Sequence, residues 1–249
     1  MTSWWLWGAS LIPAVLTSAC GGGGASGTRP HDMNAAAHES AAQEEDRKAE
    51  QLASRHDAGR PSPAAKCHPG QRGAACWTSR GNPTEKYQKL STQARELAAR
   101  HRAASAALRD AEAQVCAGIS DEDRDLSPFA NRKDIRSVGD LTETEGGGEG
   151  TFVERVAGLQ VVFRATPGLS AEWLQRVVDC HLARNAVIGH EAAAHEMDYC
   201  PLTLRGVAAR VSSTGDGFAI SIRSNDQKVV EELRRRGRAL LAGEAALRP

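Results

Sequence analysis

Large apolar side chains are scarce in most of this chain and become frequent only in its last hundred residues. Aromatic residues make up 4% of the 249 residues, and three of the five tryptophans lie within the first seven positions. Alanine and glycine supply much of the apolar content, but their burial removes little surface from water. We therefore predict a small packed core in residues 151–249 and loosely packed or disordered chain in much of the remainder.

Charge and length narrow the class of protein further. The chain carries 31 basic and 31 acidic residues, so its formal net charge is zero. A general nucleic-acid binder shows a basic excess or a basic stripe, so the composition predicts that nucleic acid is not a partner. A chain of this length forms one or two domains.

The segment 151–249 has the pattern of a compact α+β domain. Residues 159–165 form a β-rich run, and residues 207–211 and 218–222 alternate apolar and polar side chains around a turn at 214–217. Ser170 is a suitable N-cap for a helix that ends near Gly189. We expect a fourth strand at residues 151–156.

A last helix completes this domain. Ser224, Asn225 and Asp226 are suitable residues for its N-terminus, and its apolar positions are Val229, Val230, Leu233, Leu240 and Leu241. The element order is β-α-β-β-α, which predicts a small sandwich that resembles the ferredoxin-like arrangement.

Two helices are expected in the region 35–118. Residues 35–56 are rich in helix formers but have only one large apolar side chain, so this helix needs a partner. A second helix starts near Asn82 and ends near Gly118, separated from the first by the loop 57–81. Its apolar positions follow heptad spacing: Tyr87, Leu90, Ala94, Leu97, His101, Ala104, Leu108, Ala111 and Val115. The pattern favours a helical hairpin, with an intermolecular coiled coil as the alternative.

Residues 119–150 are acidic and end in a glycine-rich run, which is typical of a linker. Asp121, Asp123 and Asp125 alternate as in a calcium loop. However, Leu126 and Arg132 occupy the positions where an EF-hand requires glycine and glutamate. We interpret this segment as a solvated acidic loop.

The N-terminal residues 1–19 are apolar, uncharged and short for a membrane span, as in a signal peptide. Residues 16–20, LTSAC, resemble the lipobox of bacterial lipoproteins, although leucine stands four residues before Cys20 rather than three. The n-region also lacks Lys and Arg. The resemblance implies that Cys20 becomes the lipid-bearing N-terminus, with residues 20–34 as anchor and flexible tether. The alternative is an ordinary secretory signal with a free Cys20.

This resemblance carries expectations about location and partners. The chain is similar to lipoproteins of unassigned activity from high-GC proteobacteria such as myxobacteria, and only six of its 31 basic residues are lysine. The resemblance to bacterial lipoproteins implies a lipid-anchored protein of the cell envelope, placed in the outer membrane and facing the periplasm. The membrane and an envelope protein are then its expected partners.

Five cysteines follow Cys20, and an exported protein meets an oxidising compartment. We expect one disulfide between Cys67 and Cys76 and another between Cys180 and Cys200, which leaves Cys116 over. Sequence spacing alone does not fix this connectivity.

The segment 180–200 is rich in groups that bind metals. His190, Glu191 and His195 resemble a zinc-protease motif, but the histidines stand five residues apart rather than four, which puts them on different helix faces. Gly189 and the following alanines favour a loop. His190, His195 and Met197 suit copper or zinc as ligands, and solvated histidines on a surface loop are the alternative.

No nucleophile elbow, Walker loop or dinucleotide fingerprint occurs in the sequence. We therefore expect no catalytic residues and no obligatory cofactor. The sequence favours a non-enzymatic envelope lipoprotein with an interaction or structural role. The alternatives are a periplasmic copper- or zinc-binding protein and an enzyme of unrecognised type.

Overall fold

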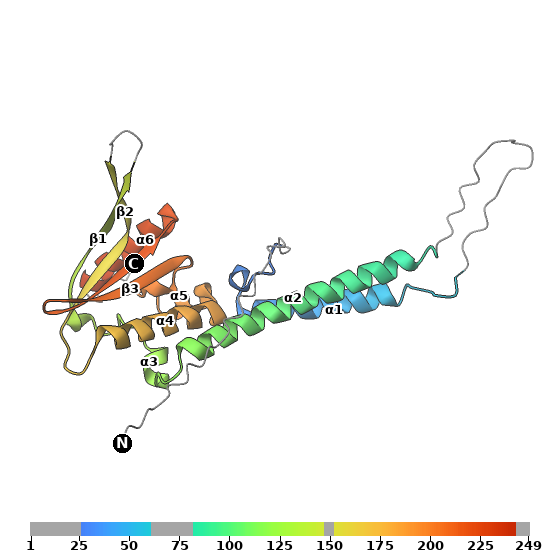
Figure 1. The fold of residues 1–249 in the computed structure, drawn as a ribbon, viewed down its shortest axis with the longest axis horizontal. Coiled ribbons are helices and arrows are strands. Elements are labelled where there is room, and N and C mark those ends of the chain that lie inside the picture. Colours follow the sequence, from blue (N-terminus) through green and yellow to red (C-terminus); the bar gives the residue numbers. More distant parts are fainter. Residues whose placement is uncertain (1–25, 61–81, 147–151, 243–249) are drawn as a thin grey trace, which may run out of the picture.

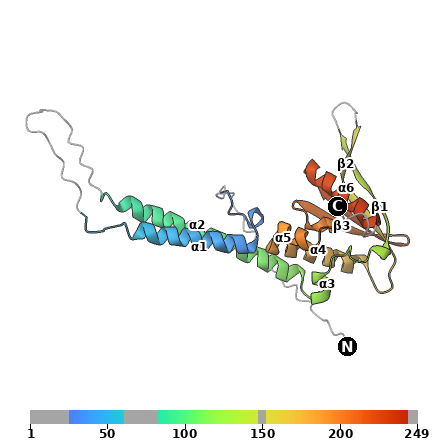
Figure 2. The ribbon, with the colours of Figure 1, turned by 180° about the vertical axis from the view of Figure 1, so that it is seen from behind.

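The computed structural model describes residues 26–60, 82–146 and 152–242. The predicted signal peptide, Cys20, Cys67 and Cys76 lie outside these residues. A long helical hairpin projects from an α+β body, and the two views in Figures 1 and 2 show the same division. No helix among the described residues combines the length and the apolar character that a membrane crossing requires.

The predicted helical hairpin is confirmed. Helices α1 (Ala35–Ala53) and α2 (Glu85–Val115) run side by side, and α2 continues beyond α1 to reach the body (Figure 1). Small side chains fill the interface, so the helices approach closely. Ser91 Oγ donates to Ala49 O at 2.8 Å and Ser105 Oγ donates to Ala35 O at 3.1 Å.

The heptad pattern of α2 marks the face that packs on α1. The pattern residues that this packing buries are Ala94, His101 and Ala104, and Leu108 is buried beyond the start of α1, beside the body. In contrast, Leu90 is exposed because its neighbour Ser91 makes the contact with α1, and Val115 is exposed because it lies beyond the start of α1. The seam therefore serves contacts within the chain.

The body contains one four-stranded sheet. Its strands are β1 (Ile135–Gly146), β2 (Phe152–Arg164), β3 (Val207–Thr214) and β4 (Gly217–Ser224), in the order β1-β2-β4-β3 with every neighbour antiparallel. The α+β fold class is confirmed in this form.

Two predictions for residues 119–156 are wrong. The segment predicted as a linker contains helix α3 (Asp121–Asp125), the short 3-10 helix η2 (Arg132–Asp134) and strand β1. β1 is also the fourth strand, since residues 152–156 belong to β2. β1 is an edge strand with one face toward solvent, so it tolerates the acidic residues that made it resemble a linker.

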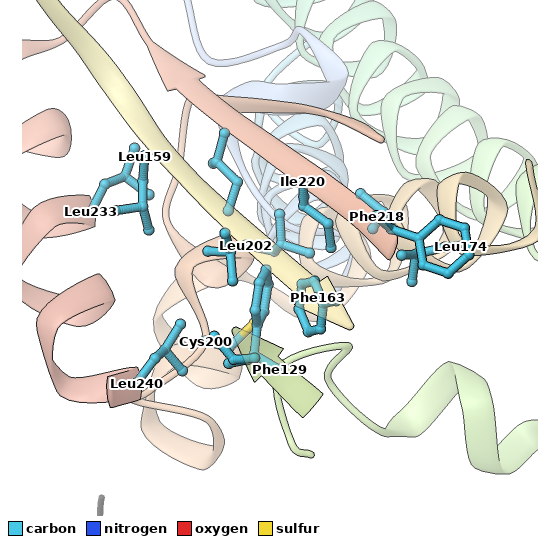
Figure 3. Close-up of a cluster of buried hydrophobic side chains, with 14 residues drawn as sticks. Phe129, Leu159, Phe163, Leu174, Cys200, Leu202, Phe218, Ile220, Leu233 and Leu240 are labelled. Atoms are coloured by element: carbon cyan, nitrogen blue, oxygen red, sulfur yellow. The ribbon is translucent and has the colours of Figure 1, made fainter. Parts of the chain in front are cut away.

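One face of the sheet forms the core. Leu159, Val161 and Phe163 of β2 lie opposite Ile222, Ile220 and Phe218 of β4. Helices α4 (Ala171–Ile188) and α6 (Gln227–Ala242) both cover this face, and Figure 3 shows their leucines Leu174, Leu233 and Leu240 around the sheet side chains. Large apolar side chains are concentrated here, as the sequence predicts.

Helix α6 lies very close to β2. A Cβ atom added at Gly237 would lie 2.5 Å from Leu159 Cδ1, so any larger residue would force the side chains of Leu159 and Val138 to move. Arg234 then reaches across to Asp140 of β1 with two hydrogen bonds of 2.8 Å. Asp226 Oδ1 accepts from Lys228 N at 2.9 Å, which confirms the predicted start of this helix.

The outer edge of β3 is covered by a side chain. Gln175 of α4 accepts a hydrogen bond from Val211 N at 2.7 Å and donates to Ala209 O at 3.4 Å. These backbone groups lie on the side of β3 away from β4, so a glutamine amide takes the place of a neighbouring strand.

Candidate functional site

A disulfide joins the hairpin to the body. Cys116, which follows the last residue of α2, pairs with Cys180 in α4, and their Cα atoms are 4.7 Å apart. The predicted pairing of Cys180 with Cys200 is wrong, because Cys200 is free and buried. Packing of α2 against α4 brings together two residues that are 64 positions apart in the chain.

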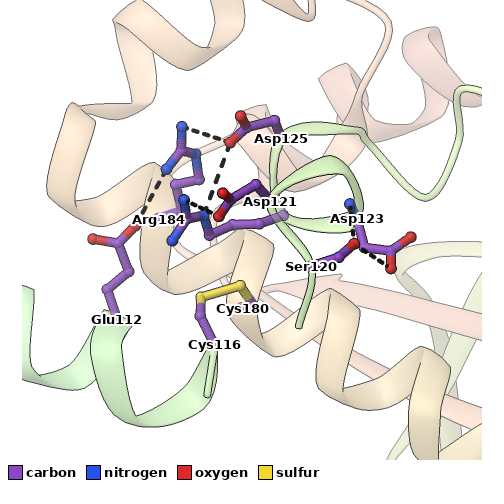
Figure 4. A network of polar contacts seen from close by, with 9 residues as sticks. Glu112, Cys116, Ser120, Asp121, Asp123, Asp125, Cys180 and Arg184 are labelled. Atoms are coloured by element: carbon purple, nitrogen blue, oxygen red, sulfur yellow. Dashed lines mark hydrogen bonds and ion pairs between the residues drawn. A yellow bond between two sulfur atoms is a disulfide. The ribbon is translucent and has the colours of Figure 1, made fainter. Parts of the chain in front are cut away.

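Apolar and polar contacts surround this disulfide. Ile119, Val177 and Trp173 pack against the two cysteines. Arg184 of α4 forms ion pairs with Asp125 at 2.7 Å and with Glu112 at 3.5 Å, as Figure 4 shows. Three elements, α2, α3 and α4, therefore meet at one junction.

The chain before α1 forms a second attachment. Asn34 Oδ1 accepts from Ala37 N at 2.7 Å, which caps the N-terminus of α1, and Asn34 Nδ2 donates to Ile188 O at 3.3 Å at the C-terminus of α4. A Cβ at Gly189 would lie 2.5 Å from Asn34 Nδ2, and Gly189 has a φ of +101°. Glycine is therefore required at this turn.

Arg205 completes this attachment. Its Nη2 donates to His31 O at 2.6 Å and to Asp32 O at 2.8 Å, in and beside the 3-10 helix η1 (Pro30–Asp32). Residues 26–34 were predicted as part of a flexible tether, and this part of the prediction is wrong. The cause is a set of long-range hydrogen bonds that leave no signal in local composition.

Two adjoining pockets lie at this second attachment, which together with the disulfide forms the junction between the hairpin and the body. The first has a volume of about 420 Å³ and includes Asp32 and Glu191 in its lining. The second has a volume of about 360 Å³ and an apolar wall that includes Leu108, Leu182 and Val207. The two pockets share four lining residues: His31, Ala186, His190 and Arg205. The first pocket is the more polar of the two and is called the polar pocket below, whereas the second is called the apolar pocket. They meet at the side chains of His31, His190 and Arg205.

His190 is held in a defined orientation at this meeting point. Its Nδ1 lies 3.1 Å from Thr203 O, and because a carbonyl oxygen only accepts, Nδ1 carries the proton. Burial lowers the pKa of His190, and nearby Arg205 and His31 lower it further, whereas the bond to Thr203 opposes this shift. Its Nε2 therefore stays an acceptor near neutral pH.

The structure does not gather the three predicted metal ligands. His190 opens helix α5 (His190–Glu196) and bonds Thr203, whereas His195 is exposed and Met197 packs against the core cluster. The prediction of a loop here is also wrong, since Gly189 turns the chain and a short helix follows. Across the described ranges, no group of three or more His, Cys, Asp and Glu side chains lies close enough to hold a metal ion.

A cysteine and a histidine meet in the core. Cys200 Sγ lies 3.4 Å from His181 Nε2, and both residues are buried. Burial raises the pKa of the Cys200 thiol. Burial, followed by the charge of Arg184, lowers the pKa of His181 to about 4. Both groups are neutral at pH 7 and sealed from water, so the pair is not prepared for nucleophilic chemistry.

Two histidines are paired inside the hairpin. His38 Nε2 lies 3.2 Å from Pro30 O and therefore donates, which leaves its Nδ1 to accept from His101 Nδ1 at 3.1 Å. Desolvation and the neighbouring His38 lower the pKa of His101, while Glu45 opposes the shift. This pair connects α2, α1 and the segment that carries His31.

A scan against protein-family models finds no match, and searches of the curated proteins and of the solved structures find none either. The function of the junction residues is therefore inferred from their own geometry.

Sequence reasoning missed the residues that form the junction. His31, Asn34 and Arg205 come from separate segments and show no common spacing. Cys116 was recognised only as a leftover thiol. The one available signal was Asn34 directly before a helix-forming run, which is an N-cap signature.

Proposed function

We propose that this chain is an exported lipoprotein, anchored to a membrane through Cys20, that has a non-enzymatic interaction role in the cell envelope. The observation that carries the proposal is the Cys116–Cys180 disulfide at the base of the hairpin. Disulfides persist in oxidising compartments, which agrees with an apolar N-terminal run followed by a lipobox-like cysteine.

The shape of the molecule supports an interaction role. The hairpin extends well away from the body, so its distal part is free to contact another molecule (Figure 1). Leu90, near the start of α2, is 45% exposed. The disulfide and the contacts of Asn34 and Arg205 hold the base of the hairpin on the body, so a force or a partner at its distal end acts on the whole chain.

The fold of the body belongs to the same proposal. β2 and β3 run parallel with β4 between them and α4 as their connection, which is the split β-α-β unit of ferredoxin-like folds. We infer a ferredoxin-like arrangement in which β1, from the N-terminal side of the unit, takes the outer position beside β2.

Lipid labelling tests the anchor. In a bacterial host fed an alkyne analogue of palmitate, the full chain should become labelled and sediment with membranes, whereas Cys20→Ser should lose both properties. Cys67→Ser is the matched control and should keep both. Label that persists in Cys20→Ser, or an unlabelled wild-type chain, contradicts the proposed anchor.

Site-specific photocrosslinking tests the interaction role. A photoreactive residue at position 90, near the distal end of the hairpin, should give a discrete adduct in cells. The same residue at Leu241, which is 54% exposed on the body, is the control. The proposal requires an adduct specific to position 90, and equal or absent crosslinking at the two positions contradicts it.

The copper or zinc hypothesis for His190, His195 and Met197 stays a prediction. A titration of the oxidised protein beside the triple alanine variant tests it. Tight stoichiometric binding that the triple variant loses would support it, and identical behaviour of the two proteins would exclude it.

A further inference from the structure

The two adjoining pockets differ in their lining and share a boundary that contains the charged side chain of Arg205. Leu108, Leu182 and Val207 line only the apolar pocket, whereas Asp32 and Glu191 line only the polar one. His31, His190 and Arg205 line both. A ligand that spans the two spaces therefore passes beside these three side chains.

Among the residues that the structure describes, none forms an ion pair with Arg205. Its guanidinium donates to two backbone carbonyls, those of His31 and Asp32. These bonds orient the guanidinium without cancelling its charge. An orientated arginine at the wall of a pocket favours a carboxylate or phosphate.

The nearby acidic side chains limit the charge of the ligand. Asp32 Oδ2 already accepts from Gly27 N at 3.0 Å and from Arg29 N at 3.1 Å, so this carboxylate oxygen is held by the backbone of its own turn and makes no ion pair with Arg205. Glu191 lines only the polar pocket, and its carboxylate there would repel a second negative charge on the ligand. The surroundings of Arg205 therefore favour a group with one negative charge.

We propose that this junction binds a small carboxylate with an apolar chain. The carboxylate accepts hydrogen bonds from Arg205 and His31 at the boundary, and the apolar chain lies over Leu108, Leu182 and Val207. The combined spaces of about 420 and 360 Å³ are of the size that small-molecule sites have. This site goes beyond the proposed interaction role and does not depend on lipidation of Cys20.

Calorimetric titration with four amphiphiles, each with a ten-carbon chain, tests the proposal. The protein is the full oxidised chain with Cys20→Ser, which keeps covalent lipid away, and each probe stays below its micelle concentration. Decanoate should bind with 1:1 stoichiometry. Decyltrimethylammonium and decyl maltoside, which carry a cationic and a neutral head group, should bind at least about tenfold more weakly. Decyl phosphate, with more negative charge, should bind more weakly than decanoate.

Two variants separate the head-group site from the apolar site. Arg205→Gln should weaken decanoate binding about tenfold or more, because a charge-assisted hydrogen bond is lost. Ala183→Phe fills the apolar pocket and should abolish binding while it leaves all three boundary residues in place. Arg210, on β3, is also exposed, and Arg210→Gln should bind decanoate as the wild type does.

The outcomes decide the proposal in either direction. Arg205→Gln removes two bonds to residues 26–34, so Ala183→Phe gives an independent test if that variant unfolds. Selective binding of decanoate that Ala183→Phe abolishes supports the site. No binding, equal binding of all head groups, or binding that Ala183→Phe leaves unchanged overturns it.

Discussion

In the hairpin, the side chains buried between α1 and α2 are mainly alanine, serine and histidine, whereas the body buries leucine, isoleucine, valine and phenylalanine. Burial of alanine removes little apolar surface from water, so the hydrophobic effect stabilises the hairpin much less per residue than the body. The hairpin depends instead on close helix contact and on its attachments: the disulfide, Asn34 and Arg205. A long projecting element can thus be built from small residues when its base is fixed to a packed domain.

The largest expected loss of stability comes from removing the disulfide between the hairpin and the body. The double variant Cys116→Ser, Cys180→Ser removes a cross-link between residues 64 positions apart. The chain-entropy model predicts a loss of about 4 kcal/mol in the free energy of unfolding. Urea unfolding of the oxidised variant and wild type measures it. Equal midpoints and slopes would mean that the hairpin and body are held together without the disulfide.

A cavity made in the core tests how strongly the burial of large apolar side chains stabilises the body. Leu233 is fully buried between α6 and the sheet, so Leu233→Ala should cost about 3 to 4 kcal/mol through lost burial and the remaining cavity. Leu233→Met conserves volume and should cost less than about 1.5 kcal/mol. Urea unfolding followed by near-UV circular dichroism reports on the body. A loss below about 1 kcal/mol for Leu233→Ala would show that the core readily collapses into the space.

Acid should destabilise the body through His181. Its pKa is about 4 in the folded chain and near 6.5 when unfolded, so the unfolded state binds the proton first as the pH falls. The contribution of His181 to the free energy of unfolding is therefore fully present above pH 6.5 and is lost as the pH falls from 6.5 to about 4. Below pH 4 this group causes no further change. The loss should reach about 3 kcal/mol.

Unfolding measured at several pH values tests this window. His181→Asn cannot titrate, so its stability, although lower throughout, should fall less steeply between pH 6.5 and 4 than that of the wild type. His101 in the hairpin shifts in the same direction, so part of the slope should remain in the variant. Identical slopes would refute the assignment to His181.

The smallest expected effect concerns added volume in the hairpin. Ala98 is fully buried against α1, so Ala98→Leu forces the helices apart and should cost about 2 kcal/mol. The neighbouring Ala99 is exposed, and Ala99→Leu should change stability by less than about 0.5 kcal/mol. Helical ellipticity during thermal unfolding gives the measurement. If Ala98→Leu proved neutral or stabilising, the close approach of the two helices would not be essential.

Elements with a strong local pattern could be predicted from the sequence. The start of α4 at Ser170 and the alternating strands β3 and β4 follow from N-cap chemistry and from the period-two pattern of a half-buried sheet. β1 was missed because an edge strand buries only part of one face, so Asp140 and Glu143 gave it the composition of a linker.

The junction could not be predicted, because it depends on tertiary packing. Cys116 meets Cys180 only after α2 lies on α4, and Arg205 meets η1 only after the chain has passed through the hairpin and most of the body. Each partner lies far away in the sequence, and no local spacing records the contact. A pocket that is lined by several separate elements therefore becomes visible only in the folded structure and not in the sequence.

Gln175 has a consequence for the behaviour of many copies of this chain at high concentration. The unpaired amide and carbonyl groups of an outer strand are a template on which another molecule can add a strand, and repetition of this step builds fibrils. Because Gln175 occupies Val211 N and Ala209 O, an incoming strand must first displace it. Resistance to aggregation on this side is therefore encoded in helix α4 as well as in the sequence of β3.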